Sequence, residues 1–369
     1  MFFHSKEIFM LKSAASEPQI TTSGHMSDYH DVRHTVASHF ARCHLDNGVK
    51  QGFERQALLN YANLSPVLLQ QQGSRIAPKQ LARLMLKIMR DGDDEFLGLA
   101  SHPCRLGMFE LLCERLILCN SLLEAMQETK RFYDLIDRGI RFELTQSEED
   151  IRITIIRENA DKDFNHLLIE YLLLVWHRFP SWLVGQVIPL KKIQFDFPEP
   201  DHAEEYRLLY PGPREFNGAS NTLIWPKAVL QLPIHRTQEQ LKRYMTQVPL
   251  QWFRKPRFSD HQTERVMQLL EQADNPHTTK LEDIAEQLHM TSRTLRRKLT
   301  AEGSRFQQMK DDLRRDQAIY WLSQEGVSIN EAGLQVGYTE TASFIRAFKS
   351  WTGLSPGQYQ KGLHDTKSS

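Results

Sequence analysis

Residues 281–299, LEDIAEQLHMTSRTLRRKL, carry the clearest structural signal in the chain. The apolar residues of the first half recur at helical spacing and predict one buried helix face. Thr291 or Ser292 is a good N-cap for a second helix. That second helix exposes four cations between Arg293 and Lys298. A short helix, a tight turn and a second, charged helix together predict a helix-turn-helix motif.

Residues 328–351, SINEAGLQVGYTETASFIRAFKSW, repeat this design. Ser328 and Glu331 have the spacing of a capping box, which favours a helix start at this point. Gly337 is suited to the turn because glycine tolerates positive φ. The sequence therefore predicts a second helix-turn-helix.

The two motifs are expected to form one all-α C-terminal domain. A long amphipathic helix over about 304–323 connects them, and the second recognition helix is expected over 340–351. Gly353 stops that helix, and Pro356 opens a last short helix through Tyr359. The expected core residues of the two recognition helices are Leu295, Leu299, Phe344 and Phe348.

The N-terminal part of the chain has a different pattern, which predicts an α+β domain. Helical periodicity marks residues 32–40, 53–64, 78–90, 122–136 and 165–178. Alternating or short apolar runs predict strands over residues 141–145, 150–155, 188–197 and 222–225.

These patterns divide the chain into five segments. We expect a leader (1–27), an effector-sensing and dimerisation domain (28–235), a linker (236–259), a double helix-turn-helix domain (260–362) and a tail (363–369). Within the leader, Met26 is an alternative start, and Gly24-His25-Met26 is alternatively a cloning remnant.

The distribution of charge, and not its total, indicates a nucleic-acid partner. The chain has 46 Lys and Arg against 46 Asp and Glu. From Leu288 to Arg315, however, eight basic residues oppose three acidic ones, a net charge of +5. A further basic cluster precedes the domain and consists of Lys242, Arg243, Arg254, Lys255 and Arg257. Such clusters are the usual electrostatic footprint of DNA binding.

The cysteines and the hydropathy pattern favour a cytoplasmic protein without a metal or another cofactor. Four cysteines are too few for a secreted disulfide scaffold and lack zinc-like spacing; they are Cys43, Cys104, Cys113 and Cys119. No apolar run reaches the roughly 18 residues of a membrane span.

The C-terminal motifs resemble the DNA-binding domain of the arabinose-operon regulator (AraC/XylS) family. The resemblance rests on residues 336–338 (VGY), 343–349 (SFIRAFK) and 353–356 (GLSP), and it extends over about 260–362. Ala332-Gly333 departs from the family pattern, in which a larger apolar residue followed by Ala is commoner. Tyr338 stands where Phe is commoner in the family. The resemblance implies a sequence-specific transcriptional regulator.

Residues 96–132 resemble the arabinose-binding-type sensor domain of the branch of this family that includes ornithine-utilisation regulators. The resemblance runs from FLGL at 96–99 through Gly107 and LLEA at 122–125 to Arg131-Phe132. It implies effector binding, dimerisation or both. We therefore expect an activator that responds to a small metabolite, forms a homodimer and contacts RNA polymerase.

An α-helix fits the major groove, where base edges can be distinguished. The candidate DNA-binding residues are the polar ones of both recognition helices: Ser292, Arg293, Arg296, Arg297, Lys298, Thr339, Glu340, Thr341, Ser343, Arg346 and Lys349. Ser292 and Thr339 are alternatively caps, and Arg346 or Lys349 alternatively contacts phosphate. Candidate residues for an effector pocket are the aromatic Phe132, Trp176, Trp182, Phe195 and Trp225, for which ordinary core packing is the alternative.

Two other functions remain open at this point. The first is a DNA-binding regulator without a ligand, controlled by its abundance or by a protein partner. The second is a DNA-repair alkyltransferase that uses Cys104, because His102-Pro103-Cys104-Arg105 partly matches a Pro-Cys-His-Arg acceptor motif. The residue after Cys104 is not the expected His.

Overall fold

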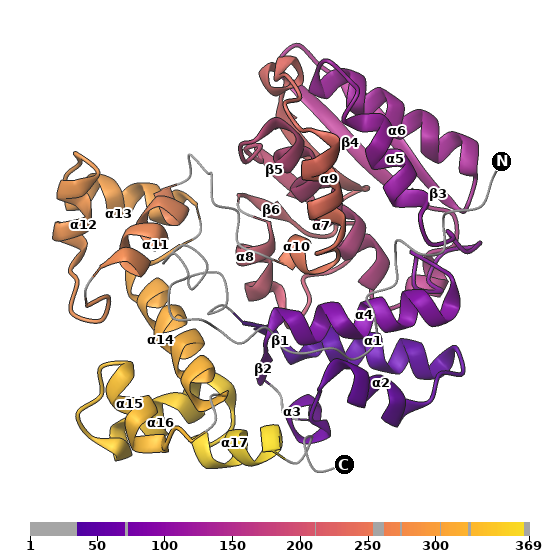
Figure 1. Cartoon of the computed structure of the whole chain (residues 1–369). Coiled ribbons are helices and arrows are strands. Elements are labelled where there is room, and N and C mark those ends of the chain that lie inside the picture. The colour runs from indigo at the N-terminus through magenta and orange to yellow at the C-terminus, as the bar shows by residue number, and fades with distance from the viewer. Residues whose placement is uncertain are drawn as a thin grey trace.

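A computed structural model describes residues 35–70, 73–210, 212–253, 262–273, 275–302, 304–323 and 326–364. The expected leader and the cations Arg254, Lys255 and Arg257 lie outside these ranges. Figure 1 shows an N-terminal body of helices around a sheet, and a C-terminal body made of helices alone. The α+β and all-α predictions are therefore confirmed.

The N-terminal body is built on a five-stranded sheet with the order β3-β4-β7-β5-β6. Neighbouring strands are antiparallel except for the parallel pair β5 and β6. The predicted hairpin is present, with Ile140 opposite Arg157 and Gln146 opposite Ile151. The strands are β3 (Ile140–Gln146), β4 (Asp150–Arg157), β5 (Lys192–Gln194), β6 (Arg214–Glu215) and β7 (Asn221–Pro226).

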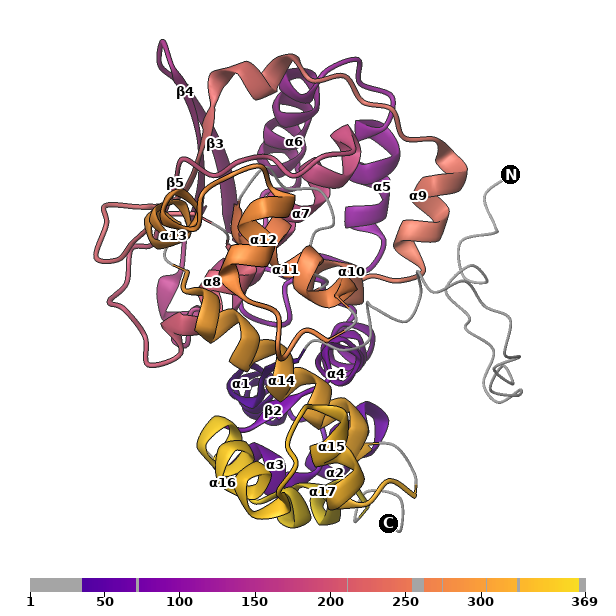
Figure 2. The ribbon, with the colours of Figure 1, turned by 90° about the vertical axis from the view of Figure 1, so that its left-hand side faces the viewer.

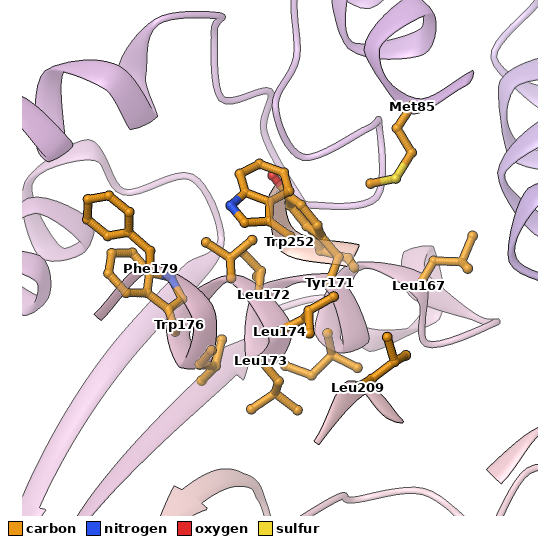
Figure 3. Packing of buried hydrophobic residues seen from close by; sticks show 14 of the residues in the cluster. Met85, Leu167, Tyr171, Leu172, Leu173, Leu174, Trp176, Phe179, Leu209 and Trp252 are labelled. Atoms are coloured by element: carbon orange, nitrogen blue, oxygen red, sulfur yellow. The ribbon is translucent and has the colours of Figure 1, made fainter. Parts of the chain in front are cut away.

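One face of this sheet packs against the helix α7 (Leu167–Val184), the centre of the N-terminal core. Ile153 pairs with Leu223, and both are fully buried. Figure 3 shows Tyr171, Trp176 and Trp252 among the residues that pack around α7. The helix is long and apolar enough to cross a membrane, but 94% of it is buried inside the protein, as expected of a core helix.

Further helices surround this core, and a small antiparallel sheet lies beside them. The helices are α1 (Ser38–Lys50), α2 (Arg55–Ala62), α3 (Pro66–Gln70), α4 (Pro78–Gly92), α5 (Met108–Leu116), α6 (Leu122–Ile136), α8 (Tyr206–Leu209), α9 (Gln238–Met245) and α10 (Leu250–Phe253). The small sheet pairs β1 (Val36–Ala37) with β2 (Arg75–Ile76).

Three expectations for this region were wrong. The helix expected over 32–40 begins only at Ser38, because Val36 and Ala37 pair with β2. The strand expected over 188–197 is reduced to β5; Pro189 cannot donate to a ladder, which accounts for the later start of the strand. Residues 236–253 were expected in the linker, with a helix over about 238–247; they form α9 at that place and also α10, and Trp252 is buried in the N-terminal core.

The C-terminal body consists of two helix-turn-helix units joined by one long helix, as predicted. The first unit contains α11 (Gln262–Gln272), α12 (Leu281–Gln287) and α13 (Ser292–Ala301). The connecting helix is α14 (Phe306–Ser323), and the second unit contains α15 (Ile329–Gln335), α16 (Thr341–Thr352) and α17 (Pro356–His364). Each unit has a hydrophobic core of its own, and α14 contributes residues to both cores.

Candidate nucleic-acid interface

The first recognition helix, α13, presents its cations to solvent. Thr291 is the N-cap, and its hydroxyl accepts a hydrogen bond of 3.2 Å from the backbone N–H of Thr294. Leu295 and Leu299 are buried, which turns the opposite face of the helix outward. That exposed face carries Arg293, Arg296, Arg297 and Lys298, and Ser292 is partly exposed at its first position. Within the described parts of the chain none of the four cations has a side-chain partner.

The second recognition helix, α16, is more polar than charged, and its side chains are linked to one another. Ser343 Oγ donates to Glu340 Oε2 at 3.3 Å, and Arg346 Nη2 donates to Ser343 Oγ at 3.0 Å. Thr341 Oγ1 donates to Asn330 Oδ1 at 2.6 Å, which joins the helix to α15. This chain of hydrogen bonds orders the polar groups before any DNA is bound.

Two further predicted residues of the second unit, Thr339 and Lys349, are exposed. Phe344 and Phe348 are fully buried on the opposite side of α16, as expected. Gly333 leaves room for this packing, because a Cβ there would lie 3.1 Å from two ring carbons of Phe344, and the ring would have to shift by a few tenths of an ångström. The departure from the family pattern at Ala332-Gly333 therefore suits the ring that it faces.

The net charge of +5 counted over residues 288–315 is larger than the positive charge available for contact with DNA. Lys310 Nζ donates to the carbonyl of Thr279 at 2.8 Å, and Arg314 Nη2 donates to the carbonyl of His277 at 3.2 Å. Arg315 pairs with Asp312 at 2.9 Å and with Asp316 at 3.2 Å. These three cations of α14 bind protein groups, so the exposed charge is concentrated on α13.

The side of α14 that carries these acidic groups meets the N-terminal body, an arrangement that the sequence did not predict. Arg207 Nη2, on α8, donates to Asp312 Oδ2 at 2.6 Å, and both side chains are largely buried. Thr35 Oγ1 donates to Asp316 Oδ1 at 2.5 Å. The local sequence feature that points to this contact is the pair of acidic residues Asp312 and Asp316, spaced four apart on α14. Their spacing does not show which part of the chain they contact.

The same contact continues onto the second helix-turn-helix unit. Arg75 donates to both carboxylate oxygens of Glu205, and the Tyr359 hydroxyl donates to the Arg75 carbonyl at 3.0 Å. Leu68, on α3, is fully buried in the core of the second unit. The N-terminal body therefore supplies part of the packing that holds α14 and α17.

The five aromatic residues proposed for an effector pocket do not share one cavity. Phe132 lines a cavity of about 20 Å³ together with Glu95 and Cys104, and that volume holds about one water molecule. Trp176 donates to the Tyr133 hydroxyl, Trp182 packs on Tyr244, Phe195 packs on Phe216, and Trp225 is buried in β7. A second cavity of about 20 Å³ is lined by none of the five and lies between α1, α4 and α7.

Cys104 has the wrong environment for an alkyl-accepting nucleophile. Its side chain is buried, and its Sγ lies 3.8 Å from Glu95 Oε2. Burial, with the nearby Glu95 and Asp94 carboxylates, raises the pKa of this thiol, whereas a reactive cysteine needs a lowered pKa. Within the described ranges no group of three or more His, Cys, Asp or Glu is placed to hold a metal.

Two family models match the chain in its two bodies. The arabinose-binding domain of AraC transcription regulator, an N-terminal domain, matches residues 52–234. A helix-turn-helix domain matches residues 284–362. The chain belongs to the AraC family. It is therefore a DNA-binding transcriptional regulator, a class whose members are generally not enzymes.

Known relatives of this AraC-family regulator are similar along most of its length or in its DNA-binding part. The ornithine utilization regulator of Pseudomonas aeruginosa is 23% identical over 333 residues, which covers 87% of this chain and 95% of that protein. The regulator VirS of Mycobacterium tuberculosis is 36% identical over 98 residues, 27% of this chain and 29% of that protein. The solved structure of the regulator CdpR from Pseudomonas aeruginosa is 20% identical, covers 87% of this chain and 98% of its own, and gives a TM-score of 0.29.

Proposed function

We propose that this regulator reads DNA with α13 and α16 in successive major grooves, and that a small metabolite bound by its N-terminal body alters that binding. The exposed cationic face of α13 carries the first part of the proposal. Both helix-turn-helix units lie on the side of the molecule away from the bulk of the N-terminal body (Figures 1 and 2). Successive major grooves on one face of DNA are roughly 34 Å apart.

The contact between the bodies supports the second part of the proposal. A ligand changes DNA binding only if it binds two arrangements of the protein with different affinity. Arg207 and Thr35 both belong to the N-terminal body, and they join it to Asp312 and Asp316 of α14 through buried polar groups. A shift of α8 or β1 on effector binding would therefore move or release α14.

We further propose a cytoplasmic homodimer that activates transcription through contact with RNA polymerase. We place the domain limits at 28–253 and 260–362, with the leader and the tail outside them. The similarity to the ornithine utilization regulator makes small amines and amino acids, ornithine included, the first ligands to test.

Genome-wide mapping of the bound sites, followed by footprinting of one site, tests the proposal. We expect protection over about two helical turns per protomer. The DNA affinity is then measured with a panel of amines, amino acids and sugars. If DNA affinity, oligomeric state and transcription stay unchanged across that panel, the proposed control by a metabolite is contradicted. Control by abundance or by a protein partner is then favoured.

A further inference from the structure

The loop before α12, residues 275–280, packs against the turn of the second helix-turn-helix unit. Gly337, in that turn, has a φ of +84°, and a Cβ placed there would lie 3.1 Å from Cδ2 and 3.2 Å from Cβ of His277. The imidazole of the first unit therefore rests directly on the backbone of the second. In Figure 1 this loop descends from α12 toward α15.

Several hydrogen bonds hold His277 in this position. Asn275 Oδ1 accepts from the backbone N–H groups of His277 at 3.2 Å and of Thr278 at 3.3 Å. From α14, Arg314 Nη2 donates to the carbonyl of His277, and Lys310 Nζ donates to the carbonyl of Thr279. The loop is thus fixed to the connecting helix on one side and to the turn on the other.

The chemistry of the ring suits a packing role. Burial lowers the pKa of His277, the positive charge of Arg314 lowers it further, and a hydrogen bond with the backbone of Gln335 opposes them. The lowered pKa favours the uncharged imidazole, which packs on the turn without a desolvated charge. The Arg314 guanidinium also lies over the Tyr338 ring, at 5.9 Å from its centroid.

We propose that His277 is a positioning residue that fixes the placement of α16 relative to α13 and thereby sets the half-site spacing that the protein accepts. A connection through α14 alone leaves bending and twisting of one helix free. The contact of His277 with the Gly337 turn adds a direct connection between the two units, beside the one that each unit makes with α14. One base pair added between half-sites turns the second groove by roughly 36°, so a rigid pair of units is intolerant of altered spacing.

The test compares DNA of different spacing, and it rests on the proposed engagement of both recognition helices. The wild-type full-length protein selects its preferred site from a random-sequence DNA library. One or two base pairs are then inserted or deleted between the half-sites, and the dissociation constants are measured by fluorescence anisotropy. We expect wild type to lose about tenfold or more per altered base pair, and His277→Ala to lose less than about threefold. Thr278→Ala, an exposed neighbour in the same loop, should behave as wild type.

A second variant keeps the test decisive if His277→Ala folds poorly. Arg314→Met removes the donor to the His277 carbonyl but keeps the aliphatic stem, so it should also flatten the spacing profile. A wild-type profile in both folded variants, even with lower melting temperatures, would overturn the positioning role. A footprint confined to one half-site would overturn the two-helix proposal and this inference together. A footprint over both half-sites with an unchanged spacing profile would overturn the role of His277 alone.

Discussion

At the scale of single residues, the two helices that we propose to read DNA present different side chains. The α13 cations have no partners within the described structure and are free to swing toward bases or phosphates. The Glu340, Ser343 and Arg346 side chains of α16 are already joined by hydrogen bonds, so they lose less conformational freedom on binding. We infer that α13 supplies most of the electrostatic attraction to DNA. The side chains of α16 are already held in place by their hydrogen bonds and lose less conformational freedom on binding.

Arg296 tests this difference, since its side chain projects from the middle of α13 beside buried Leu295. A guanidinium can contact a guanine edge with two hydrogen bonds. Arg296→Ala should therefore weaken binding to the selected site by about 1–3 kcal/mol and relax the preference at one base position.

The measurement is a binding curve on the selected site and on random DNA. Arg131→Ala, which removes a 68% exposed arginine on α6 of the N-terminal body, serves as the control. An equal loss on both DNAs would assign Arg296 to phosphate contact and not to base reading.

At the scale of elements, local sequence signals predicted what depends on local structure. The caps at Thr291 and Ser328, and the glycine turn at Gly337, all lie where the sequence placed them. The Thr291 cap also resolves one alternative, because Ser292 lies inside the helix and is not the N-cap. One element that depends on a distant partner was not predicted: β1 forms where β2 pairs with it.

The side chain of Phe348 shows how strongly one element depends on its core. It is fully buried and packs on Phe344 and on Tyr359, at ring-centroid distances of 5.8 and 5.5 Å. Phe348→Ala should destabilise the second unit by about 3–5 kcal/mol, since the cavity cannot be refilled by these rings. DNA binding should fall as a consequence of unfolding.

Thermal melting followed by circular dichroism measures this loss. Leu334→Ala in α15 is the matched control, since the Leu334 side chain is 54% exposed and should contribute little. A melting curve for Phe348→Ala that superimposes on wild type would contradict the packing assigned to the second unit.

At the scale of the whole molecule, the two bodies are joined by contacts between residues very far apart in sequence. Thr35 and Asp316 are 281 positions apart, and Arg207 and Asp312 are 105 apart. No periodicity or motif connects such residues, which is why the sequence predicted the two domains but not the surface between them. The five aromatic residues proposed for an effector pocket were chosen for their type alone. They all pack in or against the one core of the N-terminal body, and the place of an effector site stays a prediction.

The Arg207–Asp312 pair gives this contact its largest expected single effect. The two side chains are 7% and 12% exposed, and after removal of Arg207 the poorly solvated Asp312 carboxylate keeps Arg315, at 2.9 Å, as its ion-pair partner. Removing one partner of a buried pair costs about 3–5 kcal/mol when the other is left unpaired, and the remaining Arg315 should make the loss here smaller. Arg207→Ala should therefore weaken the contact between the bodies, and hydrogen exchange in α14 and α17 should increase while the sheet of the N-terminal body stays protected.

A double variant separates the loss of the contact from the presence of a carboxylate that has lost its partner on α8. Arg207→Met with Asp312→Leu replaces the pair by apolar groups of similar volume, a change that is often neutral or stabilising. If the bodies are held together by this surface, the double variant should restore protection in α14, and the single variant should not. Because α14 also carries Arg314 and Lys310, which hold the His277 loop, the single variant should in addition broaden the DNA spacing that the protein accepts. Unchanged exchange in α14 in the single variant would mean that Arg207 does not hold the bodies together, and coupling between effector and DNA would have to follow another route.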